Sequence, residues 1–117
     1  LAFMDIMPRC DGHMLVIPKT PARNVLDASP AQLAACMKTV QKVATAAMKA
    51  FGAGGITVQQ FNEPAGGQVV FHLHFHIIPR WAGDTNFITV VGQVRVIPSA
   101  LEQMWETCAA TAKSLNV

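Results

Sequence analysis

The order of hydrophobic and polar residues predicts two pairs of β-strands in the first part of the chain. Leu1–Ile6 and His13–Pro18 are apolar runs separated by a proline and an Asp-Gly step, which predicts a hairpin. Ile56–Phe61 and Val69–Pro79 show the same strand-like pattern on either side of a glycine-rich loop. These two segments predict a second, wider hairpin.

Between the hairpins, the pattern changes to the period of a helix. Ser29 is placed to cap it, Pro30 suits its first turn, and Gln32 completes a capping box. Apolar residues then recur every three or four positions until Gly52 ends the pattern. We expect the helix to bury one stripe against the sheet, including both methionines as core residues: Leu33, Met37, Val40, Ala44, Ala47, Met48 and Phe51.

The pattern is less regular after Trp81. Phe87–Ile97 alternates like a strand in places, but Gly92 interrupts it. Ser99-Ala100-Leu101-Glu102 is a second capping box that predicts a C-terminal helix. We therefore expect one α+β domain over residues 1–117, with an antiparallel sheet of about five strands, one long helix and a C-terminal helix.

Composition narrows the class of protein. The chain is 51% apolar and 14% charged, so it can build a core and is too apolar for disorder. Its net charge of +2 is small and scattered, which excludes an electrostatic nucleic-acid binder, and no apolar run is long enough to span a membrane. The three cysteines lack a CxxC spacing, which favours a reducing, cytoplasmic setting. The chain opens at Leu1 in a strand-like run, so we expect further residues upstream.

Three of the four histidines lie within five residues: His72, His74 and His76. On a strand, residues two apart share a face, so the three imidazoles would lie on one side about 6.5 Å apart. Imidazole can act as a nucleophile, base, acid or ligand near neutral pH. Burying three of them costs desolvation that only function or a metal offsets, so the pattern indicates a chemical site.

One chemistry that fits is a metal site. Two alternating histidines can hold one Zn²⁺, with His13, Asp5 or Glu63 as further ligands. The three positions of the alternating run span about 13 Å, however, which is too far for all of them to bind one ion.

The other chemistry is phosphoryl transfer, with a histidine as the nucleophile. Gly66-Gly67 precedes the histidine strand, and glycines let backbone N–H groups approach an anion closely. Asn62 and Gln68 add neutral hydrogen-bond donors beside this loop. Both features would meet at one end of the same strand, which favours this interpretation.

The run His72-Leu73-His74-Phe75-His76-Ile77-Ile78 resembles the His-x-His-x-His-x-x motif of the histidine triad (HIT) superfamily of nucleotide hydrolases and transferases. The likeness extends to Asn62-Glu63, Gly66-Gly67-Gln68, Asp5-Ile6 and Gly12–Lys19, and so covers the chain from its start to Trp81. The resemblance implies a HIT-like fold and a bacterial-type nucleotide hydrolase or phosphoramidase. It also implies a homodimer in which the two subunits share one continuous sheet.

The resemblance also implies roles for individual residues. His74 would be the nucleophile that forms a nucleotidyl-phosphohistidine, and His72 and His76 would contact the phosphate and assist proton transfer. Gln68 would lie beside the leaving group. Asp5 would bind the ribose hydroxyls, and the implied substrate-binding residues together are Phe3, Asp5, Ile6, His13, Asn62, Gly67 and Val69.

We therefore expect a hydrolase that cleaves nucleoside 5′-phosphoramidates or dinucleoside polyphosphates at the α-phosphate, with a purine nucleotide as substrate and without metal or cofactor. Two alternatives stay open: a nucleotide-binding interaction module with little turnover, and a Zn-dependent hydrolase. Some relatives carry a zinc site completed by downstream histidines, but Lys19 is followed here by Thr20 and no spare histidine remains. In the transferase branch of the superfamily that acts on sugar nucleotides, the third histidine is replaced, so by this resemblance the presence of His76 favours hydrolysis.

Overall fold

The computed structural model describes residues 1–84 together with residues 106, 109–110 and 113–114. The chain divides into two compact units, Leu1–Asp84 and Thr85–Val117. In the second unit, the described residues 106, 109–110 and 113–114 are helical. The expected strand within Phe87–Ile97 and the capping box at Ser99 lie outside the described residues.

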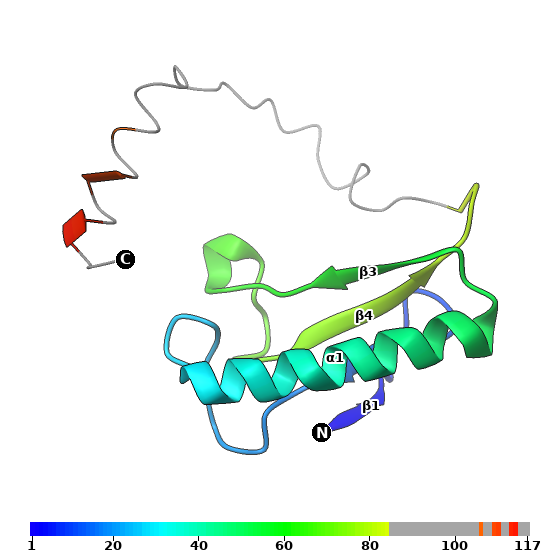
Figure 1. Ribbon diagram of the computed structural model, residues 1–117, viewed down its shortest axis with the longest axis horizontal. Coiled ribbons are helices and arrows are strands. Elements are labelled where there is room, and N and C mark those ends of the chain that lie inside the picture. The colour runs from blue at the N-terminus through cyan, green and yellow to red at the C-terminus, as the bar shows by residue number, and fades with distance from the viewer. Residues whose placement is uncertain (85–105, 107–108, 111–112, 115–117) are drawn as a thin grey trace. The chain divides into compact units, whose positions relative to one another are not determined.

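The first unit contains one antiparallel sheet of four strands in the order β1-β2-β4-β3 (Figure 1). Leu15 of β2 and Gln59 of β3 both lie opposite His76, so β4 runs between these two strands. The strands are β1 (Ala2–Met4), β2 (Met14–Val16), β3 (Gly55–Gln59) and β4 (Phe75–Arg80). Both predicted hairpins and the α+β class are confirmed.

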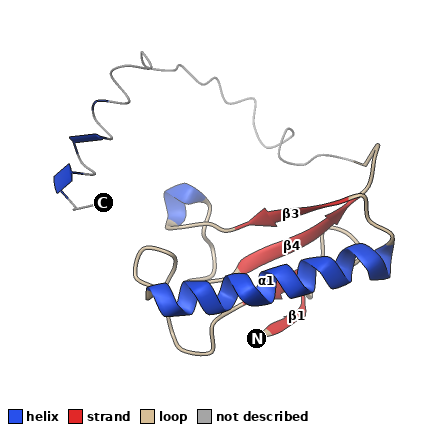
Figure 2. Cartoon of the chain, viewed as in Figure 1, coloured by secondary structure: helices blue, strands red, loops and turns tan. Residues whose placement is uncertain are grey.

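The long helix α1 (Pro30–Phe51) begins and ends where the sequence predicts. The backbone N–H of Gln32 donates to Ser29 Oγ at 3.1 Å, and the N–H of Ser29 donates to Gln32 Oε1 at 2.8 Å. Gly52 ends the helix in the left-handed conformation, with φ of 59°. The helix crosses one face of the sheet and contacts β2, β3 and β4 (Figure 2). No helix in the described part of the chain is both long and apolar enough to span a membrane.

The buried stripe of α1 is rotated from the predicted one. Cys36, Val40 and Ala47 are buried, whereas Met37 and Met48 are 47% and 38% exposed. The prediction that both methionines belong to the core is therefore wrong. The helix is rich in alanine, so two overlapping stripes have the same period, and only packing against the sheet decides which one is covered.

The histidine strand is shorter than predicted. β4 begins at Phe75, because its neighbours stop there: Val16 at the end of β2 lies opposite Phe75, and Gln59 at the end of β3 lies opposite His76. Without partner strands, residues 69–74 follow an irregular path. The expected inward side chains do form the core, since Leu73, Phe75 and Ile77 are at most 7% exposed.

Candidate active site: three histidines on one cavity

The three alternating histidines line one cavity of about 430 Å³. His74 and His76 are in edge-to-face contact, with ring centroids 5.0 Å apart. Asp5 adds a carboxylate to the lining, and the remaining lining side chains are apolar: Phe3, Ile6, Leu15, Ile17 and Val70. The cavity therefore joins a group of imidazoles to a largely hydrophobic wall.

His74 is oriented by the backbone of the same segment. Its Nδ1 lies 2.6 Å from the carbonyl oxygen of His72. A carbonyl oxygen only accepts hydrogen bonds, so Nδ1 carries the proton, and in the neutral ring Nε2 then keeps its lone pair. This is the state in which an imidazole can act as a nucleophile. His72 is fixed in a similar way, because its Nε2 lies 3.0 Å from the carbonyl oxygen of Pro18.

A buried relay of hydrogen bonds lies behind His76. The backbone N–H of Arg9 donates to Nδ1 of His13 at 3.1 Å, so the proton of the neutral His13 ring is on Nε2. That nitrogen is 3.0 Å from Nδ1 of His76 and 3.5 Å from Oδ2 of Asp5. Nδ1 of His76 therefore accepts, and its Nε2 is left as an N–H donor.

Both histidines of this relay favour the neutral form. Burial, followed by the neighbouring His74 and His13, lowers the pKa of His76 from 6.5 to about 4. Burial also lowers the pKa of His13, although Asp5 acts in the opposite direction. At neutral pH, His76 is thus a neutral donor rather than a cation.

The relay does not have the hydrogen-bond pattern of a metal centre. Asp5, His13 and His76 each place one potential ligand atom within 4.8 Å of the others, which is close enough for one ion. A ligating imidazole nitrogen must be unprotonated, and its other nitrogen normally donates to an acceptor. In His13 the arrangement is reversed, because Nδ1 faces the N–H of Arg9. The Zn-dependent alternative therefore does not fit these residues.

Comparison with known proteins bears on the motif directly. Residues 1–83 match the family described as the HIT domain. The chain belongs to the HIT family. The resemblance inferred from the histidine motif is thus confirmed.

The HIT chain is similar to the crystal structure of a HIT-like protein from Bartonella henselae, with a TM-score of 0.71 and 61% identity over 72% of this chain and 64% of that one. It is 34% identical to the AP-4-A phosphorylase of Mycobacterium tuberculosis, over 86% of this chain and 52% of that protein. It is 35% identical to the adenylylsulfatase HINT3 of Arabidopsis thaliana, over 73% of this chain and 46% of that protein. The chain spans about half the length of these two curated relatives.

The cavity of the HIT chain brings together six of the residues named from the sequence and places His13 directly behind them. The six are Phe3, Asp5, Ile6, His72, His74 and His76. Leu15, Ile17 and Val70 also line it and were not predicted. Val70 shares the alternation of the histidines, so that signal was present in the sequence. The position of Leu15 depends on sheet register, because it lies opposite both Phe3 and His76.

Gln68 is buried and does not line the histidine cavity. It is 3% exposed, and its Oε1 accepts from Asn24 Nδ2 at 3.0 Å and from the N–H of Glu63 at 2.8 Å. Its Nε2 donates to the carbonyl oxygens of Arg23, at 2.7 Å, and Val70, at 3.0 Å. These bonds use both donors and both acceptor positions of the amide.

The glycine loop does not form the expected anion nest. The N–H groups of Gly66 and Gln68 both donate to the carbonyl oxygen of Glu63, and that of Gly67 donates to Pro64 within the short 3₁₀ helix η1 (Pro64–Gly66). The side chain of Asn62 is likewise bonded to Gln60 and to the N–H of Val25.

The segment after the loop has backbone donors to spare. Val69 is 83% exposed and lies outside the cavity lining. Within the described part of the chain, no hydrogen bond involves the backbone N–H groups of Val69, Val70 and Phe71. Val70 itself lines the cavity, whereas Gly66 and Gly67 do not.

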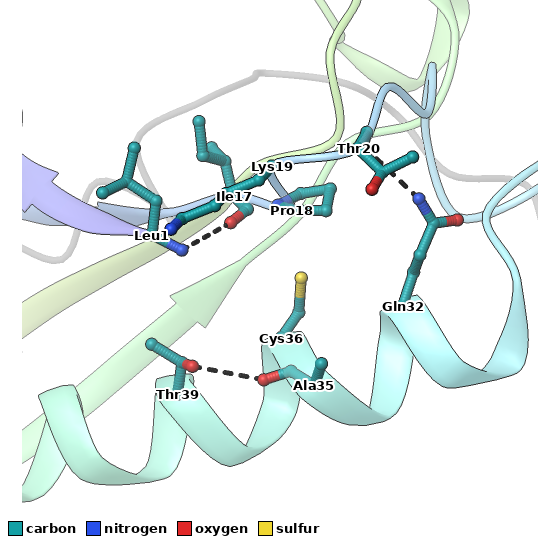
Figure 3. Close-up of a pocket in the computed structure, with 9 residues that line it drawn as sticks. All are labelled: Leu1, Ile17, Pro18, Lys19, Thr20, Gln32, Ala35, Cys36 and Thr39. Atoms are coloured by element: carbon teal, nitrogen blue, oxygen red, sulfur yellow. Dashed lines mark hydrogen bonds between the residues drawn. The ribbon is translucent and has the colours of Figure 1, made fainter.

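A second cavity, of about 240 Å³, lies between α1 and the segment that follows β2 (Figure 3). Cys36 points into it from the helix, and none of the four histidines lines it. Two of its polar side chains bond to nearby carbonyl groups, Gln32 to Thr20 and Thr39 to Ala35. The histidine cavity is therefore the candidate active site.

Proposed function

We propose that this HIT protein hydrolyses nucleotides at the α-phosphate through a covalent intermediate on His74. The observation that carries the proposal is the 2.6 Å contact between His74 Nδ1 and the carbonyl oxygen of His72. It leaves the Nε2 lone pair available, and within the described part of the chain no hydrogen bond occupies that nitrogen. A nucleophile that is held and unprotonated without a separate base suits attack on phosphorus.

In the first step, Nε2 of His74 forms a bond to the α-phosphorus while the bond from phosphorus to the leaving group breaks. The ring gains positive charge, which the hydrogen bond from Nδ1–H to the carbonyl oxygen of His72 stabilises. In the second step, water displaces the imidazole and releases a nucleoside monophosphate. The leaving group takes up a proton and the attacking water gives one up, so the two steps consume one water.

The phosphoryl oxygens need donors while negative charge develops on them. Nε2–H of the neutral His76 and the unbonded backbone N–H groups of Val69–Phe71 are suited to this role. The N–H groups of the glycine loop are already bonded within the loop. In this respect the proposal departs from the donors expected from the sequence.

The nucleoside would occupy the apolar end of the cavity. Phe3 and Ile6 offer hydrophobic surface for a purine base, and Asp5 offers carboxylate oxygens to the two ribose hydroxyls. Oδ1 of Asp5 already accepts from the N–H of Met7 at 2.8 Å, which fixes the side chain. A cavity of about 430 Å³ is large enough for a nucleotide-sized ligand.

The names of two relatives support a nucleotide substrate, because both an AP-4-A phosphorylase and an adenylylsulfatase act on adenine nucleotides. We propose nucleoside phosphoramidates or dinucleoside polyphosphates as substrates for this chain. A comparison of adenosine 5′-phosphoramidate, diadenosine polyphosphates and adenylyl sulfate, each with and without a chelator, would identify the preferred leaving group. Activity that is lost to the chelator and restored by Zn²⁺ would contradict the metal-free mechanism.

A homodimer is proposed on the basis of two exposed features. Among the described strands, β1 and β3 are the edges of the sheet, and edge strands favour pairing with a second chain. On α1, Met37, Met48 and Phe51 are 38% to 47% exposed. Sedimentation of the purified protein tests the oligomeric state, and the double variant Met37→Glu with Met48→Glu should shift a dimer to monomer.

The cytoplasmic location stays a prediction.

The test of the mechanism is His74→Ala. We expect turnover of adenosine 5′-phosphoramidate to be lost while adenosine monophosphate still binds, because the base and ribose contacts remain. Thr45→Ala, on the exposed face of α1, serves as the control and should keep full activity. Wild-type protein that binds the monophosphate but turns over none of the substrates would favour the interaction-module alternative. Full activity in His74→Ala would overturn the proposal.

A further inference from the structure

A group of four bonded side chains in contact with Val70 and Phe71 is not used by the proposed mechanism. We call it the Asn24 cluster, and it consists of Arg23, Asn24, Glu63 and Gln68. Asn24 is at its centre and is 1% exposed. Its Nδ2 donates to Glu63 Oε1 at 2.8 Å and to Gln68 Oε1 at 3.0 Å, while its Oδ1 accepts from the N–H of Leu26 at 2.9 Å.

The cluster is connected to the cavity through Gln68. Nε2 of Gln68 donates to the carbonyl oxygen of Val70 at 3.0 Å, and Val70 lines the cavity two residues before His72. The N–H of Leu73 donates to the carbonyl oxygen of Ala22 at 2.8 Å, which joins the same two segments at a second point. Hydrogen bonds thus connect residues 22–24 to Val70 and Leu73, which flank His72 in the chain.

His72 is bonded to Pro18 and Leu73 is buried in the core, but the three residues that precede His72 have little support outside the cluster. Val69, Val70 and Phe71 are 83%, 62% and 46% exposed, and none of them belongs to a strand. The described contacts that hold them are the Gln68 bond to Val70 and the guanidinium of Arg23, which lies 4.1 Å above the ring of Phe71. Both contacts come from members of the Asn24 cluster.

The cluster also surrounds Glu63, whose backbone conformation is unfavourable for a residue other than glycine. Its φ of 62° and ψ of 162° lie in a region that glycine favours, and among the described residues it is the non-glycine residue with positive φ. Its carboxylate accepts from Arg23 at 2.7 and 2.8 Å and from Asn24, and its N–H donates to Gln68. Such a backbone persists only where its surroundings fix it.

We propose that Asn24 is a positioning residue for the reaction at His74. By holding Gln68 and Glu63, it fixes the segment from Val69 to His72, and so the carbonyl oxygen that orients the His74 ring. Asn24 touches no substrate. The expected effect on kcat rests on the proposed function. The orientation of the His74 ring does not, because it can be measured without turnover.

The role requires a side chain that donates twice, which an amide does and a carboxylate does not. Asn24→Asp would place an ionised carboxylate against the carboxylate of Glu63 and the acceptor oxygen of Gln68. The other charged groups that face this position are Arg23, which bonds Glu63, and Asp27, whose Oδ1 accepts from the backbone N–H of residue 24. Protonation of the new carboxyl group at low pH would restore one donor.

The kinetic experiment compares Asn24→Ala and Asn24→Asp with wild type on adenosine 5′-phosphoramidate, using the full chain. We expect kcat to fall about tenfold to a hundredfold with KM nearly unchanged, because a small misplacement of reacting groups has effects of this size. Asn24→Asp should recover part of its loss as pH is lowered, and Asn24→Ala should not. Val40→Ala, which removes buried methyl groups from α1 and no hydrogen bond, controls for reduced stability.

The second readout is the imidazole NMR spectrum of His74 and hydrogen exchange at the N–H groups of Glu63 and Gln68. In Asn24→Ala we expect faster exchange at both groups and loss of the single Nδ1–H tautomer. If that variant does not fold, Arg23→Met, which loosens the cluster from its exposed side, should show the same changes to a smaller degree. An unchanged tautomer together with a wild-type kcat in a folded variant would overturn the proposal. If wild type turns over no nucleotide, the proposed function fails, and the tautomer still decides the positioning role.

Discussion

The two walls of the histidine cavity are held in place by different kinds of interaction. On one side, Phe3 and Leu15 lie opposite each other on paired strands, where the backbone ladder of β1 and β2 fixes them. On the other side, Val70, His72 and His74 follow an irregular path that depends on side-chain hydrogen bonds from distant residues. The regular wall, formed by the sheet, offers hydrophobic surface and carries His76, and the irregular wall carries His72 and the proposed nucleophile His74.

This difference has a physical reason. A strand places its backbone N–H and carbonyl groups in the ladder, so few remain for a ligand. An irregular segment leaves such groups free, as at Val69–Phe71, and it can turn a carbonyl group toward a ring, as His72 does toward His74. The segment must then be held by side chains, which makes the site sensitive to changes that touch no ligand.

The largest effect should come from the irregular wall itself. We expect His74→Ala to reduce kcat by at least about a thousandfold, since removal of a nucleophile leaves only binding and electrostatic contributions. Rapid mixing with a radiolabelled nucleotide, followed by alkaline quench, should trap a phosphohistidine in wild type and none in the variant. Labelling that persists in His74→Ala would move the nucleophile to another residue.

The next effect concerns the residue between two of the histidines. Leu73 is 0% exposed in the core on the opposite side of the segment from the cavity. Leu73→Ala should lower the free energy of unfolding by about 2–5 kcal/mol, because it leaves a cavity that the sheet and α1 cannot close. Urea unfolding measures this. A loss below that range would mean that the irregular segment adapts more easily than its buried position indicates.

The regular wall should show a different kinetic signature. Phe3→Ala removes hydrophobic surface that contacts substrate and transition state alike, so we expect KM to rise about tenfold with kcat nearly unchanged. Asn24→Ala should show the reverse, a lower kcat at constant KM. Steady-state kinetics of the two variants on one substrate would separate the walls. A fall in kcat for Phe3→Ala would mean that this wall also orients the reacting groups.

The smallest effect is a dependence of stability on pH. Burial first, and then the neighbouring His74 and His13, lower the pKa of His76 from 6.5 to about 4. Between these values the unfolded chain binds a proton that the folded chain does not, so stability is full above pH 6.5 and falls as the pH drops toward 4. The lowered pKa of His13 acts in the same direction. Thermal unfolding across this range should show a shallower slope in His76→Asn, and an equal slope would assign the dependence to other groups.

The sequence alone determined the features that depend on neighbouring residues. The capping box at Ser29, the glycine that ends α1, both hairpins and the burial of Leu73, Phe75 and Ile77 all follow from local pattern. The histidine motif is also a local pattern, and it predicted the family correctly. Caps, turns and alternation work over a few residues, and for that reason they can be read without the fold.

Only the tertiary structure decided where β4 begins, which stripe of α1 is covered, and which groups near the histidines are free to bind. β4 begins where its two neighbours provide partners, and the exposure of Met37 follows from the side on which the sheet packs. Gln68 looked like a free donor in the sequence, but its Nε2 already donates to the carbonyl oxygen of Arg23, which is 45 positions away, and to that of Val70. Hydrogen-bonding capacity is limited for each group, so a residue distant in the chain determines what a site residue can still do.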